Sequence, residues 1–376
     1  MGRVQLRLSI LIARSAGWLS RTFARKSGET LPGRILLSLC PNALTLLSSG
    51  RTVLLVSGTN GKTSTTKALA AMAASRGTVV TSGTGSNLSW GAASALMKHG
   101  EYAVLEVDEL HLPNVAAQTN PAVVLLLNLT RDQLHRMHEV KKVASRWREM
   151  AEKSSAHFVG DIDDPFVNYA LGGAQSSTRV SFGGRHHPDG SACPSCGQYL
   201  DWNGGIYSCP CGLNNTSAHL QLEGETAGAR NYRLAQVAAE IVGVRAKGLE
   251  VDADMERTAD IARSGRHAHL RLTKNPASWT EALRGVHGDN VILILNARQV
   301  DGIDTSWLWD VTFAALKGKK VLVTGERALD MAYRLHVEGV ESELADNFDK
   351  AMESFDTGAQ VEVLAAYTAF HGLVMR

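Results

Sequence analysis

The sequence predicts an α/β protein with a parallel sheet, a cysteine-rich insertion and a second, smaller α/β domain toward the C-terminus. Three observations predict this class. Short Val- and Leu-rich runs alternate with helical patterns between 52 and 153, which is typical of a parallel sheet covered by helices. The apolar periodicity stops at 183, and Gly, Pro, Asn and Cys dominate up to 215. Strand-like runs return between 290 and 365.

The individual elements follow from the period of the apolar residues. Strands are predicted at 52–56, 78–81, 102–107 and 122–127, and again at 290–295, 320–323 and 361–365. Helices are predicted at 65–75, 141–153 and 232–244. We therefore divide the chain into an N-terminal helical segment (1–48) packed on a central domain (49–264), with an insert at about 185–215, and a C-terminal domain (265–376).

Overall charge gives no support to nucleic-acid binding. The 376 residues contain 39 Lys and Arg against 37 Asp and Glu, which leaves a formal charge of +2. No segment has the run of about 20 apolar residues that a membrane-spanning helix requires.

The N-terminal segment is basic, because no acid precedes Glu29. A secretory signal is disfavoured because Arg14 interrupts the apolar stretch. Two interpretations stay open: a transit peptide or membrane-surface helix, and an amphipathic helix docked on the protein's own body. For either helix, one side is formed by Leu6, Ile10, Ala13 and Trp18, and the basic residues are Arg3, Arg7, Arg14, Arg21, Arg25 and Lys26.

The stretch "SGTNGKTSTT" (57–66) predicts a phosphate-binding loop between a buried strand and a helix N-terminus. Position 56, where a Walker A motif has its first glycine, is valine, so the loop is a shortened form. We expect Lys62 to reach the β- and γ-phosphates and Thr63 to ligate Mg²⁺. The alternative is an ordinary turn with a solvated Lys62. The remaining candidate nucleotide contacts in the loop are Gly58, Thr59, Asn60, Gly61 and Ser64.

Four of the five cysteines form the pattern C-x2-C-x12-C-x-C: Cys193, Cys196, Cys209 and Cys211. Two close thiolate pairs separated by a hairpin-sized loop suit tetrahedral Zn²⁺ in a zinc ribbon. The second pair is tighter than usual, so His187 or water is an alternative fourth ligand. Free or redox-active thiols are the competing interpretation. Cys40 stands in an apolar context and is predicted to be buried.

The loop "GTNGKTST" (58–65) resembles that of the Mur ligase family, which includes the amide-bond-forming enzymes of peptidoglycan synthesis and the folylpolyglutamate synthetases. "LEVDEL" (105–110) and "NLTRDQL" (128–134) resemble further stretches of that family. The resemblance implies a central P-loop ATPase domain that binds ATP and Mg²⁺. Glu106 is implied as a Mg²⁺ ligand, the alternative being a solvated acid at a strand end. Other implied site residues are Asn128, Asp132, Gln133, Asn231 for adenine or ribose, and Arg266 for the γ-phosphate.

The cysteine insert, "KNPASWTEAL" (274–283), "DGIDTSWLWD" (301–310) and "GERALDMAYRL" (325–335) resemble the synthetase subunits of lipid II isoglutaminyl synthases within this family. This implies a Rossmann-like C-terminal domain and ATP-dependent amidation of the α-carboxylate of D-glutamate in lipid II through an acyl phosphate. Ammonia is implied to come from a partner glutaminase of the GatD type. An aspartate of this domain is implied to support that partner, and the candidates are Asp301, Asp304 and Asp310. We favour Asp304, because Thr305 and Ser306 beside it could cap a helix and fix its position; the alternative is Asp304 itself as an N-cap before Trp307.

The resemblance further implies a bacterial cytoplasmic protein with peripheral membrane contact through its lipid substrate. No nucleophilic-cysteine glutaminase motif is recognisable in the chain, which agrees with ammonia supplied in trans. Two alternatives stay open: a Mur or folylpolyglutamate-type amino-acid ligase, and a nucleotide-binding scaffold without turnover. Leu234 and Ala268 depart from the family pattern, and no lysine is identified for carbamylation.

Overall fold

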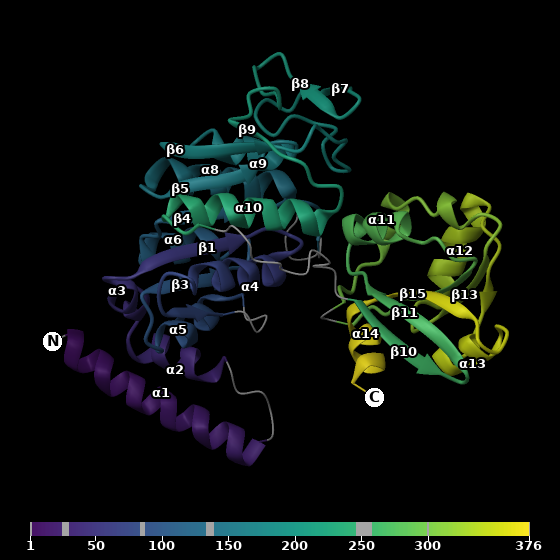
Figure 1. The fold of residues 1–376 in the computed structure, drawn as a ribbon, viewed down its shortest axis with the longest axis horizontal. Coiled ribbons are helices and arrows are strands. Elements are labelled where there is room, and N and C mark those ends of the chain that lie inside the picture. Colours follow the sequence, from purple (N-terminus) through teal and green to yellow (C-terminus); the bar gives the residue numbers. More distant parts are fainter. Residues whose placement is uncertain are drawn as a thin grey trace. The chain divides into compact units, whose positions relative to one another are not determined.

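A computed structural model describes residues 2–24, 30–82, 87–132, 139–245, 258–298 and 301–375. The described chain divides into two compact units (Figure 1). The N-terminal unit takes in the residues up to Leu129 and those from 140 to 245. The C-terminal unit takes in residues 130–132, Glu139 and the residues from 258 onward.

A parallel sheet forms the centre of the N-terminal unit. Its strands are β1 (Thr52–Ser57), β2 (Val79–Thr81), β3 (Tyr102–Glu106), β4 (Val123–Leu126), β5 (His157–Asp161), β6 (Ser176–Ser181) and β9 (Leu220–Gln221). Within the described residues their order is β2-β3-β1-β4-β5-β6-β9, and every neighbouring pair is parallel. The predicted parallel α/β sheet is confirmed, whereas β5, β6 and β9 were not predicted.

Strand β1 lies between β3 and β4, and this position determines where a ligand can bind. Val56 pairs with Glu106 on one side and with Leu125 on the other. The carboxyl ends of the three strands therefore lie at one edge of the sheet. The chain passes from one side of β1 to the other between β3 and β4, and open α/β sheets bind ligands at such a crossing.

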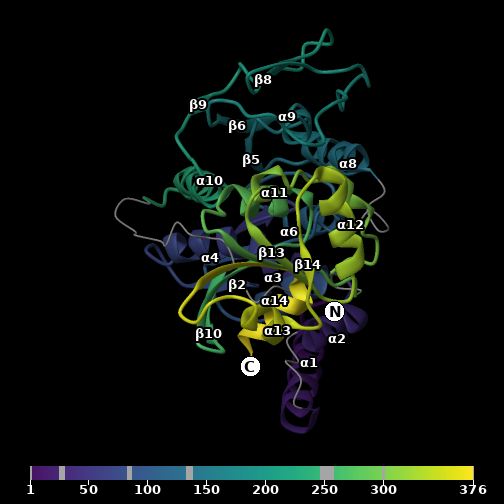
Figure 2. The same cartoon turned by 90° about the vertical axis from the view of Figure 1, so that its right-hand side faces the viewer.

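Helices cover both faces of this sheet (Figures 1 and 2). Helices α4 (Lys62–Ala73) and α10 (Ala227–Ile241) pack on one face, and their apolar side chains form a common core with those of β1, β3 and β4. The other face is covered by α5 (Ser89–Leu96), α6 (Leu112–Thr119), α8 (Val140–Lys153) and α9 (Pro165–Leu171). Burial on both faces explains why the central strands read as continuous apolar runs.

Three helices precede β1: α1 (Gly2–Ala24), α2 (Leu31–Leu39) and α3 (Ala43–Ser48). Helix α1 packs on α2, which in turn packs on α5. The predicted helical segment is thus part of the N-terminal unit. Among the described helices we find none that combines the length and the apolar character needed to cross a membrane.

The cysteine module (residues 183–219) is inserted between β6 and β9. It contains an antiparallel hairpin of β7 (Asp201–Asn203) and β8 (Ile206–Ser208). Its small core is formed by Cys193, Leu200, Tyr207 and Cys209. The predicted insert is therefore a separate folded module on the sheet.

A second sheet forms the centre of the C-terminal unit. Its strands are β10 (Thr258–Arg263), β11 (Arg266–Leu272), β12 (Asn290–Ile294), β13 (Lys320–Thr324), β14 (Glu343–Leu344) and β15 (Gln360–Ala365). They are ordered β10-β11-β15-β12-β13-β14 in the described part of the chain, and only β10 is antiparallel to its neighbour. One face carries α11 (Pro276–Arg284), the 3₁₀ helices η1 (Ser306–Asp310) and η2 (Ala314–Leu316), and α12 (Ala328–Glu338). The other carries α13 (Phe348–Glu353) and α14 (Tyr367–Val374).

The boundary predicted at 265 falls inside the β10–β11 hairpin, whereas the structure assigns both strands to the C-terminal unit. Strand β10 was missed because it is an edge strand with half-exposed and exposed side chains and few apolar residues. Ser264 and Gly265, with φ of 51° and 73°, form the two-residue turn. Two positive φ values are typical of tight hairpin turns, so the Ser-Gly pair was the signal available in the sequence.

Candidate active site

The predicted phosphate loop, residues 58–61, connects β1 to α4. Helix α4 begins at Lys62, and no side chain caps its N-terminus. Gly61 has φ of +83°, and a Cβ at this position would lie 2.1 Å from Asn231 Nδ2. Glycine is therefore required at 61 both by backbone conformation and by the close approach of α10. The result is a helix N-terminus whose amides face a loop, an arrangement that binds anions.

Lys62 is buried and turned back over this loop, with 8% of its surface exposed. Its Nζ donates to the carbonyl of Gly58 at 2.5 Å and to that of Thr59 at 3.3 Å. It also forms an ion pair with Glu109 Oε1 at 3.1 Å. These contacts exclude a merely solvated lysine. Glu109 is itself buried, in the turn after β3, and was not singled out as the partner of Lys62.

Asn128 holds the loop from the neighbouring strand end. Its Oδ1 accepts from the Asn60 N–H at 3.0 Å, and its Nδ2 donates to the Asn60 carbonyl at 2.9 Å. Its backbone carbonyl accepts from the Thr59 N–H at 2.8 Å. The structure thus places Asn128 against the loop, and its contact with the nucleotide stays a prediction.

Glu106 and Thr63 occupy the same edge of the sheet. Glu106 ends β3, is 2% exposed, and its N–H donates to Ser82 Oγ at 2.8 Å. This burial excludes a solvated acid at the strand end. Thr63 and Ser64 lie in the first turn of α4 and are half-buried. A carboxylate and a hydroxyl are oxygen ligands of the kind that Mg²⁺ prefers, so the donor set fits the predicted ion.

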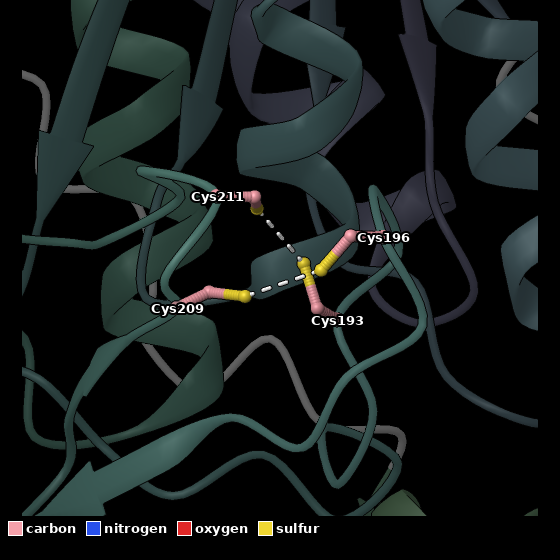
Figure 3. Close-up of side chains that lie close together, drawn as sticks. All are labelled: Cys193, Cys196, Cys209 and Cys211. Atoms are coloured by element: carbon pink, nitrogen blue, oxygen red, sulfur yellow. Dashed lines mark hydrogen bonds between the residues drawn. The ribbon is translucent and has the colours of Figure 1, made fainter.

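The four cysteines of the module come together as predicted (Figure 3). Their sulfur atoms all lie within 4.8 Å of one another, with 3.6 Å between Cys193 and Cys211 and 3.4 Å between Cys196 and Cys209. Four thiolates around Zn²⁺ at about 2.3 Å are separated by about 3.8 Å, so the arrangement fits a tetrahedral metal site. His187 is not part of the cluster that the described residues form.

Each cysteine pair is followed by a glycine with positive φ, Gly197 at +80° and Gly212 at +93°. These glycines allow the chain to turn so that backbone N–H groups face the sulfur atoms. A hydrogen bond from the backbone of Leu213 is the main reason why the pKa of Cys211 is lowered to about 7. Burial raises the pKa of Cys193, and the pKa of Cys209 is raised to about 12, so of these three thiols only Cys211 is shifted toward the thiolate form that binds a metal.

Three aspartates, at the end of β5 and in the turn after it, attach the cysteine module to the sheet, and all are almost completely buried. Asp161 pairs with Arg185 at 2.7 Å. Asp163 accepts from Ser181 Oγ at 2.9 Å and from Asn215 Nδ2 at 3.1 Å. Burial raises the pKa of Asp161, because the paired Arg185 only partly offsets the loss of water.

The third aspartate, Asp164, connects the module to the phosphate loop. Its Oδ2 lies 3.3 Å from Nε2 of His187 and accepts from the N–H of Leu129 at 2.7 Å. Leu129 directly follows Asn128, the residue that clamps the loop. Burial alone would raise the pKa of Asp164, but His187 and backbone N–H donors hold that pKa below its ordinary value. Sequence reasoning missed this connection, although the acidic stretch "DIDDP" (161–165) after a strand was a signal for it.

Asp304 lies in the C-terminal unit, before η1. Its Oδ1 accepts from the Ser306 N–H at 2.9 Å, but Thr305 is the N-cap of η1 and no side chain caps that helix, so the alternative of Asp304 as the N-cap is wrong. Asp301 accepts from the Thr368 N–H and hydroxyl, both at 2.7 Å, so it holds α14 in place.

Asp132 forms an ion pair with Lys274 at 3.4 Å, and Gln133 lies outside the described residues. A pocket in this unit is lined by Arg131, Asp132, Lys274, Asn275, Pro276, Asp301, Gly302, Asp304 and Trp307.

Arg266 donates hydrogen bonds to backbone carbonyls of the C-terminal unit. It begins β11, and its guanidinium donates to the carbonyl of Phe355 at 2.5 and 3.0 Å and to that of Ser264. Lys274, which lines the pocket, follows the opposite end of the same strand. These contacts give Arg266 a structural role beside the β10–β11 turn and no support as a γ-phosphate ligand.

Two family models match the chain: the Mur ligase middle domain over residues 56–192 and the MurT ligase C-terminal domain over residues 272–370. A curated relative from Staphylococcus aureus (strain N315), the MurT subunit of lipid II isoglutaminyl synthase (glutamine-hydrolyzing), is 26% identical over 387 residues. That match covers 89% of this chain and 88% of the relative.

Two solved structures show the same fold at low sequence identity. A pseudomurein peptide ligase type C from Methanothermus fervidus has a TM-score of 0.66 and 16% identity, covering 85% of this chain and 77% of the other. The MurF ligase from Thermotoga maritima, solved in complex with ADP, has a TM-score of 0.60 and 15% identity. The match covers 90% of this chain and 81% of the other.

The fold and the matches together define the class of protein, which is an α/β protein with the Mur-ligase fold. The names of the relatives support a ligase. Within that class the finer resemblance is also confirmed, because the chain is similar over most of its length to MurT subunits of lipid II isoglutaminyl synthase.

Proposed function

We propose that the protein amidates the α-carboxylate of D-glutamate in the stem peptide of lipid II, at the expense of ATP. The observation that carries this proposal is the buried Lys62 over the loop of a Mur-ligase domain, in a chain similar to MurT subunits along nearly its whole length. In the proposed reaction a carboxylate oxygen attacks the γ-phosphorus and ADP leaves, giving an acyl phosphate. Ammonia then attacks the acyl carbon, the bond to phosphate breaks, and the nitrogen loses a proton.

The loop residues have distinct roles in this reaction. Lys62 exchanges the carboxylate of Glu109 for the β- and γ-phosphates, while backbone N–H groups from Gly58 to Ser64 surround them. Thr63 and Glu106 hold Mg²⁺, which when bound neutralises phosphate charge. Asn231, whose amide lies against Gly61, faces the nucleotide from α10. The four cysteines hold structural Zn²⁺, because a closed set of four thiolates leaves no open position for a substrate.

A glutaminase of the GatD type is the proposed source of ammonia, and a surface of the C-terminal unit supports such a partner. Leu329, Tyr333 and Val337 recur every four residues along α12, so they share one side of that helix, and all three are exposed. Exposed Trp309 of η1 contacts the Tyr333 ring, with 6.2 Å between ring centroids. Exposed Ile303 stands next to Asp304. We call Ile303, Trp309, Leu329, Tyr333 and Val337 the α12 surface.

Tyr333→Asp is expected to raise the Kd for the partner glutaminase by about tenfold or more, because aromatic residues carry much of the energy of protein interfaces. Glutamine-dependent amidation should fall with it, whereas amidation from ammonium chloride should stay unchanged. Titration calorimetry and an amidation assay check both effects. Leu344→Asp, at an equally exposed apolar position on β14, is the control and should bind normally. Normal partner affinity in Tyr333→Asp would show that the partner binds elsewhere.

The proposed function is tested by incubating the protein with the partner glutaminase, ATP, Mg²⁺, lipid II and either glutamine or ammonium chloride. Mass spectrometry should show replacement of a carboxylate oxygen by an amide nitrogen at D-glutamate. Addition of an amino acid instead would identify an ordinary peptide-forming ligase. Nucleotide binding without any product from either nitrogen source would favour a scaffold and refute the proposal.

A further inference from the structure

Helix α1 is amphipathic in an unusual way, because it has one face on the protein and a second apolar face in solvent. The first face is docked on α2: Leu6 and Ala13 are buried, and a Cβ on Gly17 would lie 2.6 Å from Pro32. Gln5 Nε2 donates to the Leu39 carbonyl at 2.9 Å, and Arg14 donates to the Met97 carbonyl at 2.7 Å. The docked-helix interpretation therefore accounts for one side of α1 only. The predicted grouping is confirmed for Leu6 and Ala13 but is wrong for Trp18, which is exposed on the other side.

The other side carries an apolar stripe that is interrupted by the exposed Ser15. At 100° per residue its members fall within about 120° of the helix circumference, opposite the buried face. They are between 46% and 77% exposed, and some of them have more than half of their surface in water. We call this set the α1 stripe: Val4, Leu8, Leu11, Ile12, Trp18 and Leu19.

The charged side chains beside the stripe are all basic. Exposed Arg7 and Arg14 lie on one border of the stripe, between it and the buried face. The sequence contains no acid before Glu29. Two such stripes brought face to face would place arginines near arginines, so the charge disfavours a second copy of the chain as the occupant.

We infer that the α1 stripe lies in the plane of an anionic lipid surface, with its apolar side chains at the boundary of the acyl chains and its arginines among the head groups. An apolar face bordered by basic residues is the arrangement that interfacial helices use. The interaction goes beyond the proposed function, because it does not depend on which carboxylate is amidated. It also gives the proposed site access to a substrate that is embedded in a membrane.

The experiment is co-sedimentation of the full-length protein with vesicles of phosphatidylcholine alone or mixed with phosphatidylglycerol. Binding is expected only to the phosphatidylglycerol vesicles, and it should weaken as salt is added. Leu8→Gln/Leu11→Gln should lower the affinity about tenfold or more, because it removes two apolar side chains from the lipid boundary. Leu329→Gln, at a similarly exposed leucine of the α12 surface, should bind as the unmodified protein does.

Equal binding by the double variant, or no preference for phosphatidylglycerol, would overturn the inference. So would a concentration-dependent dimer that the double variant abolishes, since the occupant would then be a second copy. Circular dichroism checks that the variant is folded. Amidation of detergent-solubilised lipid II separates the two proposals: its persistence in the double variant is expected, and its absence in the unmodified protein would refute only the proposed function.

Discussion

Lys62→Ala is expected to lower ATP-dependent amidation by about a hundredfold or more, since it removes the cation that faces the phosphates in a water-poor site. Titration with a fluorescent ATP analogue and the amidation assay measure the effect. Lys67→Ala is the matched control, because Lys67 lies on the same helix with its side chain in solvent. Unchanged turnover in Lys62→Ala would show that the loop does not serve as the phosphate site.

The same substitution leaves the buried Glu109 without its lysine partner. Breaking a buried ion pair from one side typically costs about 3–5 kcal/mol, so the single variant should also unfold more easily. Lys62→Ala/Glu109→Gln removes the second charge as well and should recover most of that stability. Recovered stability without recovered amidation would show that the lysine acts on the nucleotide, whereas recovered amidation would refute its catalytic role.

Loss of the metal site is the second large effect. Cys193→Ser should abolish stoichiometric zinc, measured by mass spectrometry of the metal, and should destabilise the protein by about 3 kcal/mol or more, because the metal closes a module with a very small core. A chelator should produce the same change in a thermal melt. The module should unfold first, since its own apolar contacts are few.

Two control variants make this result specific. Cys40→Ser changes the one cysteine outside the cluster and should keep full zinc content. Ser195→Ala changes an exposed residue between Cys193 and Cys196 and should leave both zinc and stability unaltered. Zinc-free protein of undiminished stability with four titratable thiols would instead support the free-thiol interpretation.

Fold prediction succeeded where strands are buried on both faces. Strands β1, β3 and β4 read as continuous Val and Leu runs for that reason. Strand β5, "HFVGD", was not predicted because Gly160 interrupts the apolar run in its sequence. That glycine is required by packing, since a Cβ there would lie 2.7 Å from Val167 of α9. The sequence of a strand does not show which helix will cross it closely.

Site prediction likewise succeeded for patterns that are local in the sequence and failed for contacts between distant segments. The order Gly-Lys-Thr after a strand located the loop, because that chemistry is local. The partner of Lys62 was not identified because Glu109 approaches it from the turn after another strand, β3. Asp164 and His187 were not paired for a similar reason: they meet only when the cysteine module folds onto the turn after β5.

The attachment of the cysteine module limits how this chain can be shortened. Removal of residues 185–215 would take away Arg185, His187 and Asn215, and three buried aspartates would lose the side chains that now pair with them or donate hydrogen bonds to them. Asp164 also positions the backbone beside the predicted phosphate loop through Leu129. The insert therefore cannot be removed by itself, and a shortened version of this protein must either keep it or replace those aspartates together with it.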